Sequence, residues 1–360
     1  MNIPGTLKQQ PCSENNIDTK FSSLWHVIGN TPMFRICYTY RGVRQHIYVK
    51  CEQYNLTGSI KDRIALYILQ QSYKFNKIRP GDKIVEVSSG NTGISFAAIG
   101  KALGHHVQII MPDWLSRERT DIIRSLGAEV LPVSREQGGF IDAMRLAELL
   151  GRENKNIFLP QQFTNTWNVD THYQTTAPEI WEQMLHHRIL VNAFVAGVGT
   201  GGTIMGVARY LQKKEPSIKV YPIEPAESPT LTTGYKKGSH RIQGISDEFI
   251  PEIIDLEQLE PVIPVHDGDA ILMAQLLATR LGLGVGISSG ANLVGAIKVK
   301  EQLGEEANVV TIFPDCNKKY LSTDLMQTEP VKPEYISSAI ELNHYQPLSR
   351  RFTTYMSSSD

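Results

Sequence analysis

Cysteine is scarce in this sequence, net charge is nearly absent, and no apolar run is long. The four cysteines, Cys12, Cys37, Cys51 and Cys316, show no close pairing, which argues against a disulfide framework or a structural zinc and fits a reducing cytoplasm. A net charge of −1 leaves no basic excess for nucleic acid or an anionic membrane. No apolar run approaches the roughly 18 residues of a membrane span, and none follows Met1 as in a signal peptide. We therefore expect a cytoplasmic protein without nucleic-acid or membrane partners.

A metal-binding pattern is also lacking. The ten histidines include the pairs His105-His106 and His186-His187, which we interpret as solvated loop or helix-end residues, so we predict no metal site. No short internal repeat is visible. With 360 residues the chain is too long for one small core and suits two lobes.

What the sequence does have is an alternation of strand-like and helix-like segments. Apolar runs of strand length recur, and helical patterns separate most of them. This alternation predicts an α/β fold with parallel-rich sheets and helices on both faces. The strand-like runs are 47–51, 84–87, 107–111, 129–133, 193–197, 219–223, 262–265 and 308–313.

Lys61 follows the turn Gly58-Ser59 and precedes a helix-like run, 64–71. A lysine at a helix start lies near the positive end of the helix dipole, which disfavours its charged form and makes the amine more nucleophilic. Such an amine forms a Schiff base with an aldehyde cofactor. The alternative is a solvated surface lysine, and the motifs downstream bear on the choice.

Two glycine-rich turns follow, each between a strand-like and a helix-like run. The first, Ser88-Ser89-Gly90-Asn91-Thr92-Gly93, brings hydroxyls, an amide and backbone N–H groups to a helix start, which suits a carboxylate or other small anion. An ordinary capping turn is the alternative, since the same residue types cap helices.

The second turn is Gly197-Val198-Gly199-Thr200-Gly201-Gly202-Thr203. Its glycines allow close approach of an anion, and its threonine hydroxyls suit a terminal monophosphate. The turn also fits G-x-G-x-x-G, and Glu224 closes the next strand-like run, so a dinucleotide site stays open as a competitor. A P-loop is excluded because no Gly-Lys-Ser/Thr follows.

Taken in order, these motifs resemble those of the cysteine synthase group of fold-type-II pyridoxal-phosphate enzymes. Each segment alone is weak, but the series spans most of the chain in the family's order. The matching segments are 28–32, 55–63, 88–93, 111–112, 127–129, 161–163, 172–176, 178–181, 199–203, 224–229, 242–245, 286–291 and 314–315.

The resemblance implies a role for each candidate residue. Lys61 would form the Schiff base with pyridoxal 5'-phosphate and move the substrate α-proton. Asn91 would contact the ring hydroxyl of the cofactor, and Ser288 its pyridine nitrogen, where a neutral serine favours β-elimination. The cofactor phosphate would be held by Gly199, Thr200, Gly201, Gly202 and Thr203. The substrate carboxylate would be bound by Ser88, Ser89, Gly90, Asn91, Thr92 and Gln162, with Gly244 at the mouth of the site.

The resemblance also implies a two-lobed fold like the tryptophan synthase β-subunit. Residues 22–53 and 166–325 would form a large cofactor-binding lobe, and 54–165 a small lobe that closes on the substrate. Residues 1–21 are expected to be flexible. The family commonly stops soon after the segment at Pro314, so the tail 326–360 departs from it, as a disordered end or a short docking segment.

The implied reaction is a β-replacement. O-acetyl-L-serine, or a related activated serine, would lose its β-substituent to leave an aminoacrylate, and sulfide would add to give L-cysteine, with ping-pong kinetics. Ser246-Asp247-Glu248 departs from the family, which has glycine at the first position. These side chains either narrow the site or face solvent. Cys316 is either a small packing residue or an oxidisable thiol near the site.

Other functions stay open at this point. Sibling β-replacement enzymes include cystathionine β-synthase without its regulatory module, cyanoalanine synthase and diaminopropionate synthase. A serine deaminase is less favoured because Thr92-Gly93 replaces that branch's usual pair. A non-catalytic binding protein and an NAD-binding oxidoreductase are more remote. By resemblance we expect a homodimer, and a possible partner is the C-terminal tail of serine acetyltransferase, whose carboxylate would dock at Ser88–Thr92.

Overall fold

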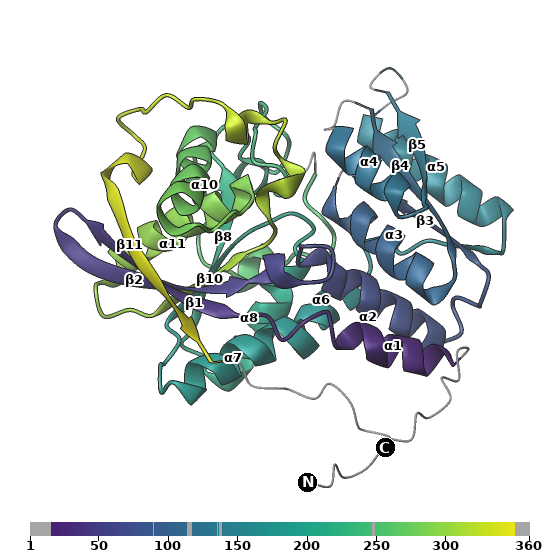
Figure 1. Ribbon diagram of the computed structural model, residues 1–360, viewed down its shortest axis with the longest axis horizontal. Helices are drawn as coiled ribbons and strands as arrows, with labels where there is room; N and C mark the ends of the chain where they lie inside the picture. The colour runs from purple at the N-terminus through teal and green to yellow at the C-terminus, as the bar shows by residue number, and fades with distance from the viewer. Residues whose placement is uncertain are drawn as a thin grey trace, which may run out of the picture.

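The computed structural model describes residues 16–88, 90–113, 117–134, 136, 139–246 and 249–349. In these ranges the chain forms two sheets, and the ribbon separates into two bodies joined through the centre of the molecule (Figure 1). No helix in the described part of the chain is long and apolar enough to cross a membrane.

The larger sheet has a parallel centre and an antiparallel edge. Its strand order is β11-β1-β2-β10-β7-β8-β9, in which β1 runs antiparallel to both of its neighbours and the other pairs are parallel. The strands are β1 (Met33–Tyr40), β2 (Val43–Cys51), β7 (Ala193–Gly197), β8 (Lys219–Pro225), β9 (Ile263–Val265), β10 (Val309–Phe313) and β11 (Ile340–Leu348).

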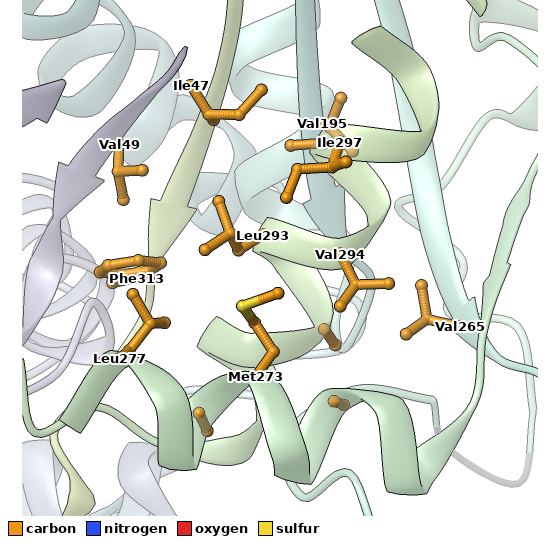
Figure 2. Packing of buried hydrophobic residues seen from close by; sticks show 14 of the residues in the cluster. Ile47, Val49, Val195, Val265, Met273, Leu277, Leu293, Val294, Ile297 and Phe313 are labelled. Atoms are coloured by element: carbon orange, nitrogen blue, oxygen red, sulfur yellow. The ribbon is translucent and has the colours of Figure 1, made fainter. Parts of the chain in front are cut away.

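Helices pack on both faces of the larger sheet. On one face lie α10 (Asp267–Leu281) and α11 (Ile287–Leu303); on the other lie α7 (Ala177–His186) and α8 (Gly202–Lys214). Burying each large apolar side chain contributes roughly 1.5–3 kcal/mol, so this core holds the strand ends in place. Figure 2 shows the first face, where α10 and α11 meet the strands through Met273, Leu277, Leu293, Val294, Ile297, Ile47, Val49, Val195 and Phe313.

The smaller sheet has the order β5-β4-β3-β6 and is parallel throughout. One face is covered by α1, α2, α3 and α4, and the other by α5. The strands are β3 (Lys83–Val87), β4 (His106–Pro112), β5 (Glu129–Val133) and β6 (Ile157–Phe158). The helices are α1 (Ile17–Trp25), α2 (Lys61–Lys74), α3 (Asn91–Leu103), α4 (Arg117–Ser125) and α5 (Gly139–Glu153).

Shorter elements connect the two bodies. α6 (Trp167–Thr171) continues through a π-helical turn, His172–Thr176, into α7, and α9 (Thr230–Thr233) follows β8. Short 3-10 turns span Glu52–Tyr54, Leu256–Gln258, Asn317–Lys319, Asp324–Met326 and Ser337–Ala339.

All eight strand-like runs in the sequence are strands in the structure, but both ends of the chain differ from expectation. The expected flexible segment 1–21 is helical from Ile17, where Asn16 caps α1, and residues 1–15 lie outside the described ranges. The tail does not stay loose: β11 pairs along the whole of β1. As an edge strand it carries mostly exposed polar residues, so no apolar run announces it. Residues 350–360 lie outside the described ranges. The lobe boundaries and their motion stay a prediction.

A buried ion network ties the start of α2 to the larger sheet. Arg63 donates to Glu52 (Nε to Oε2, 2.6 Å) and to Glu179 (Nη1 to Oε1, 2.8 Å), and Lys50 Nζ lies 2.7 Å from Glu179 Oε2. All four side chains are at most 2% exposed. Burial opposes ionisation of Glu179, but Arg63 and Lys50 outweigh it and hold the pKa of that carboxyl below its usual range.

Candidate active site

A cavity of about 460 Å³ lies where the starts of several helices meet. β3 leads into α3 there, β7 into α8, and α2 and α11 begin at the same place. The carboxyl ends of parallel strands are the usual position of ligand sites in α/β folds. Of the residues proposed from the sequence, the lining includes Lys61, Ser88, Gly90, Asn91, Thr92, Gln162, Gly199, Thr200, Gly201, Thr203, Gly244 and Ser288.

Of the proposed residues that the structure describes, Gly202 does not line this cavity. Ser89 lies outside the described residues. Gly202 is the first residue of α8 and packs against Asn168: a Cβ on Gly202 would lie 1.9 Å from Asn168 Oδ1. Glycine is therefore required at position 202 for close packing against Asn168 behind the loop.

Lys61 is the first residue of α2 and is half-buried in the cavity wall. The segment before it is fixed against the segment after β10: Ile60 N–H donates to Pro314 O at 2.8 Å, and Cys316 N–H donates to Gly58 O at 3.2 Å. Gly58 has φ +79°, the left-handed region that favours glycine, and a Cβ there would lie 3.1 Å from Cys316 Sγ. Cys316 thus packs behind the lysine turn and is not part of the cavity lining.

The turn at Ser88 is internally braced. Ser88 Oγ accepts from Gly90 N–H at 3.1 Å and Gly93 N–H at 2.9 Å, so its own O–H is left to donate. Thr92 Oγ1 donates to Gln162 Oε1 at 2.7 Å, and Gln162 Nε2 donates to Val87 O at 3.0 Å. This turn and Gln162 therefore form one braced wall, whose remaining donors, the Ser88 hydroxyl and the second N–H of Gln162 Nε2, suit a carboxylate.

Asn91 is held from the other body of the molecule. Its Nδ2 donates to Asp315 Oδ2 at 2.7 Å, and its Oδ1 accepts from Lys319 Nζ at 2.7 Å. Tyr320 OH donates to the same oxygen of Asp315. The amide is oriented by these two partners, because an ammonium only donates and a carboxylate accepts.

The glycine-rich turn presents a helix start with no side-chain cap. Gly201 is the N-cap of α8, with φ +88°, and no side chain accepts from the first turn. The first N–H groups of a helix have no partner within it, and together they favour an anion. The backbone approach is close, since a Cβ on Gly199 would lie 2.6 Å from Gly244 O, and one on Gly201 would lie 2.1 Å from Ile254 Cγ1.

The two threonine hydroxyls of this turn are oriented from behind. Asn168 Nδ2 donates to Gln162 O and to Thr200 Oγ1, each at 2.9 Å. Because Thr200 Oγ1 accepts there, its O–H is available to the cavity. His172 Nε2 lies 3.2 Å from Thr203 Oγ1. Burial, and then the charges of Lys61 and Arg63, hold the pKa of His172 well below its ordinary value, so this imidazole is neutral.

Ser288 and the segment at Gly244 complete the lining. Ser288 is buried in the first turn of α11, and its hydroxyl makes no hydrogen bond with the described part of the protein. Ser246 has φ +56°, in the left-handed region that favours glycine, and its Oγ donates to Ser228 O and Thr230 Oγ1 at 3.3 Å each. Ser246 is therefore part of the cavity wall rather than a solvent-facing residue. Asp247 and Glu248 lie outside the described residues.

This donor set fits pyridoxal phosphate. An uncapped helix start with two oriented hydroxyls suits the phosphate, a buried hydroxyl suits the ring nitrogen, and Lys61 lines the same cavity as the turn at Ser88. At Gly199, Gly201 and Gly202 an added Cβ would collide with neighbouring atoms, so this loop has no room for larger side chains. In the described part of the chain no group of three or more His, Cys, Asp or Glu could hold a metal ion.

The dinucleotide interpretation is wrong for this turn. Glu224, the candidate ribose-binding carboxylate, is 1% exposed and caps α9 instead. Its Oε2 accepts from Leu231 N–H at 2.8 Å and from Thr232 N–H at 3.3 Å, and the Thr232 hydroxyl donates to its other oxygen. No acceptor on Glu224 is left facing a ribose.

Sequence reasoning did not find the residues that orient the proposed ones. Asn168, Asp315 and Lys319 are polar and buried, and each contacts a cavity residue from an element distant in sequence. Only Asp315 lay in a recognised motif, without a role. Buried polar residues find hydrogen-bond partners, but the local sequence around these three does not name the partner.

Comparison with known proteins agrees with this site. Residues 24–315 match the family model described as pyridoxal-phosphate dependent enzyme. The chain is 39% identical to a cysteine synthase of Staphylococcus aureus over 305 residues, 84% of this chain and 96% of the relative. The chain thus belongs to the pyridoxal-phosphate dependent enzymes, in the cysteine synthase group, and pyridoxal phosphate is its cofactor.

Solved structures point the same way. A hydrogen sulfide-producing enzyme from Fusobacterium nucleatum has TM-score 0.91 and 48% identity, covering 93% of this chain and 100% of that chain. A variant of that enzyme was solved with an α-aminoacrylate intermediate, at 49% identity, TM-score 0.88 and coverage of 90% and 97%. An O-acetylserine dependent cystathionine β-synthase from Helicobacter pylori has TM-score 0.74 and 35% identity, covering 83% and 97%. The fold is therefore that of fold-type-II pyridoxal-phosphate enzymes.

Proposed function

We propose that this protein replaces the β-substituent of an activated serine, O-acetyl-L-serine in the first place, with sulfide to give L-cysteine. The observation that carries the proposal is the convergence on one cavity of Lys61, the braced turn at Ser88 and the uncapped start of α8. The identity to a cysteine synthase over 84% of the chain supports it.

Each wall of the cavity has a task in this proposal. When bound, pyridoxal phosphate supplies the aldehyde that captures the substrate amine and the electron sink that stabilises charge at the α-carbon. The amine of Lys61 takes the α-proton and returns it after the nucleophile has added. The hydroxyl of Ser88 and the second amide N–H of Gln162 bind the carboxylate and orient the α-C–H bond toward Lys61, while the Thr92 hydroxyl holds Gln162 in place.

The remaining residues hold the cofactor in register. The start of α8, Thr200 and Thr203 bind the phosphate, and the hydroxyl of Ser288 bonds the ring nitrogen. A neutral hydroxyl does not protonate that nitrogen, so the electron sink stays moderate and loss of the β-group is favoured. Asn91, oriented by Lys319 and Asp315, donates to the ring hydroxyl.

A second candidate is the opposite use of the same chemistry, with cysteine as substrate and hydrogen sulfide as the leaving group. It is favoured by the 48% identity to a hydrogen sulfide-producing enzyme, which exceeds the 39% identity to a cysteine synthase. In both cases sulfur enters or leaves at the β-carbon, so the cavity residues keep the same tasks.

Initial rates with matched substrate pairs test the proposal. O-acetyl-L-serine with sulfide is expected to give cysteine faster than L-cysteine alone gives sulfide. Faster sulfide release from cysteine would establish the second candidate. Turnover of serine with homocysteine, with neither sulfide reaction, would reject both and identify a cystathionine β-synthase. Lys61→Ala is the blank in each assay, because it removes the acid–base group.

The expected partners belong to this proposal as well. A homodimer predicts a light-scattering mass of twice the 40.3 kDa chain. A peptide ending in a free carboxylate, as in the tail of serine acetyltransferase, would compete with O-acetyl-L-serine at the Ser88 turn. The same peptide amidated at its end is the matched control, since it lacks the charge that the turn binds.

A further inference from the structure

A second cavity, of about 260 Å³, lies on the antiparallel edge of the larger sheet. Three strands supply its walls: Arg35 and Cys37 come from β1, Arg44 and His46 from β2, and His344 from β11. In Figure 1 the β1–β2 hairpin and β11 lie at the left, on the opposite side of the larger body from α3, α4 and α5.

The register of the strands explains why these side chains meet. Cys37 is paired with His46 on one side and His344 on the other, and the register shifts between Cys37 and Tyr38. Side chains directly opposite on antiparallel strands share a face and lie about 4.5–5.5 Å apart at Cβ. The irregularity on the β11 side opens the surface at this point, as bulges do at sheet edges.

The charges in this cavity are of one sign. Arg35 Nη2 lies 3.3 Å from His46 Nδ1, and Arg35 Nε is buried without a hydrogen-bond partner in the described part of the protein. Within the described ranges no carboxylate is within ion-pair distance of Arg35 or Arg44. Guanidinium groups brought together without an acid repel one another, and an anion relieves that cost.

The neighbouring groups add to the positive potential. Lys300 of α11 is 1% exposed, and its amine donates to Glu305 O and Ala307 O rather than to a carboxylate. Burial, then Arg35 and Lys300, lower the pKa of His46 to about 4. Acids near these groups are Glu306 and Glu305, beside Lys300, Glu301, which acts on the cavity residue Tyr38, and Glu341, which pairs with Thr39 further along the hairpin.

We propose that this cavity is a binding site for a small, doubly charged oxyanion such as phosphate or sulfate. Arg44 and Arg35 each offer planar N–H donors that match two oxygens of such an anion, and Arg35 Nε supplies the buried donor that lacks a partner. Asn343 and His344 close the third side from β11, so the C-terminal segment that the sequence left without a role completes the site.

The site is separate from the active-site cavity, and the two share no lining residue. His46 lies five positions before Cys51, where β2 ends near the lysine turn. At roughly 3.3 Å per residue this is about 16 Å along the strand. The proposal therefore stands independently of the reaction proposed above.

Calorimetric titration of the cofactor-saturated protein with inorganic phosphate, and separately with sulfate, tests the site. Both titrations are made at constant ionic strength against potassium chloride. Saturable binding is expected, weakened about tenfold in Arg44→Gln through loss of a charge-assisted hydrogen bond. Arg44 is exposed and unpaired, so this variant keeps the fold. Arg41→Gln, on the same hairpin but outside the cavity, is expected to bind as the wild type does.

A second readout comes from His46 itself. Sulfate is expected to raise the pKa of the His46 imidazole in a histidine-labelled NMR titration, because the anion favours the charged ring. Sulfate is the probe here because it stays doubly charged near pH 4, where phosphate is singly charged. Assignment by His46→Gln identifies its signal among the ten histidines. The proposal is overturned by absence of saturable binding of both anions, by equal binding in wild type and Arg44→Gln, or by a His46 pKa that sulfate leaves unchanged.

Discussion

Lys61 and Arg63 are two positions apart on α2 and stand in opposite surroundings. Lys61 is half-buried and faces a cavity of about 460 Å³. Arg63 is fully buried, and Glu52 and Glu179 satisfy its guanidinium on both sides. About half a turn of helix thus separates a lysine that lines the cavity from an arginine that is buried in an ion network.

The difference shows how this fold positions the lysine at the cavity wall through its neighbours. The buried ion network of Lys50, Glu52, Arg63 and Glu179 fixes the first turn of α2 against β2 and α7, and with it the backbone of Lys61. The pairing of the lysine turn with Pro314 and Cys316 fixes it from the other side. The rigidity of this turn comes from the neighbours of Lys61, which place its amine at the cavity wall.

The largest expected effect separates the two cations by activity. Lys61→Ala should lower kcat of the β-replacement by about 10³-fold or more, because it removes the acid–base group. Its free energy of unfolding should change little, since Lys61 is not part of the buried ion network of Lys50, Glu52, Arg63 and Glu179. Steady-state rates and urea unfolding measure both. Lys74→Ala, exposed at the other end of α2, is the matched control. Retention of more than a tenth of the activity would contradict the role of Lys61.

Arg63→Met should have the converse effect. Removing this partner leaves Glu52 and Glu179 buried without their main cation, a cost of about 3–5 kcal/mol in the free energy of unfolding. The soluble fraction should still bind pyridoxal phosphate through Lys61. Chemical denaturation measures the loss, with Arg79→Met on the surface as control. A change below about 1 kcal/mol would show that the network is not structural.

Glu86 is another buried carboxyl, and it differs from Glu52 and Glu179 because no cation pairs with it in the described part of the chain. Burial raises the pKa of its carboxyl to about 8, against the N–H groups of Val87, Gln161 and Gln162. The folded state therefore holds this proton more tightly than the unfolded state. The stabilisation is full below the unfolded pKa near 4.3 and is lost as pH rises toward 8, by up to about 1.4 kcal/mol per pH unit.

Glu86→Gln should remove that slope. Unfolding free energies between pH 5 and about pH 8 are expected to fall in the wild type and to stay flatter in the variant. Glu153→Gln, exposed at the end of α5, should keep the wild-type slope. Parallel curves for wild type and Glu86→Gln would show that this carboxyl does not titrate in that range.

The smallest expected effect concerns Asn168. It is buried like Arg63, but it hydrogen-bonds a residue of the cavity, Thr200, rather than an ion pair. Asn168→Asp replaces the donor to Thr200 by an acceptor, so the Thr200 hydroxyl must turn away from the phosphate. The dissociation constant of pyridoxal phosphate should rise about tenfold, measured by equilibrium dialysis. Asn154→Asp, exposed after α5, is the control with the same change of charge. Unchanged cofactor affinity would remove Asn168 from the site.

Sequence patterns predicted the parts of this molecule that depend on local chemistry. Apolar runs predicted the buried strands, and turn residues before helix-like runs predicted both anion-binding turns, because each signal lies within a few consecutive residues. The roles given to Lys61, Asn91 and Ser288 came from resemblance and stay predictions that these variants test.

The parts that sequence did not predict depend on distant partners. β11 is polar and exposed, so only its pairing with β1 makes it a strand. Asn168 and Lys319 gain their meaning from Thr200 and Asn91, which lie 32 and 228 positions away. Asn16, which caps α1, is a local helix-start signal, but it stands in a polar stretch that resembles a flexible end.

The most direct test of the central claim is a visible absorption spectrum of the purified protein, before and after O-acetyl-L-serine, and again after sulfide. We predict a visible band from lysine-bound cofactor that shifts with O-acetyl-L-serine and returns on addition of sulfide, with the starting band lost in Lys61→Ala. Absence of a visible band after incubation with pyridoxal phosphate, or an unaltered band in Lys61→Ala, would contradict the account.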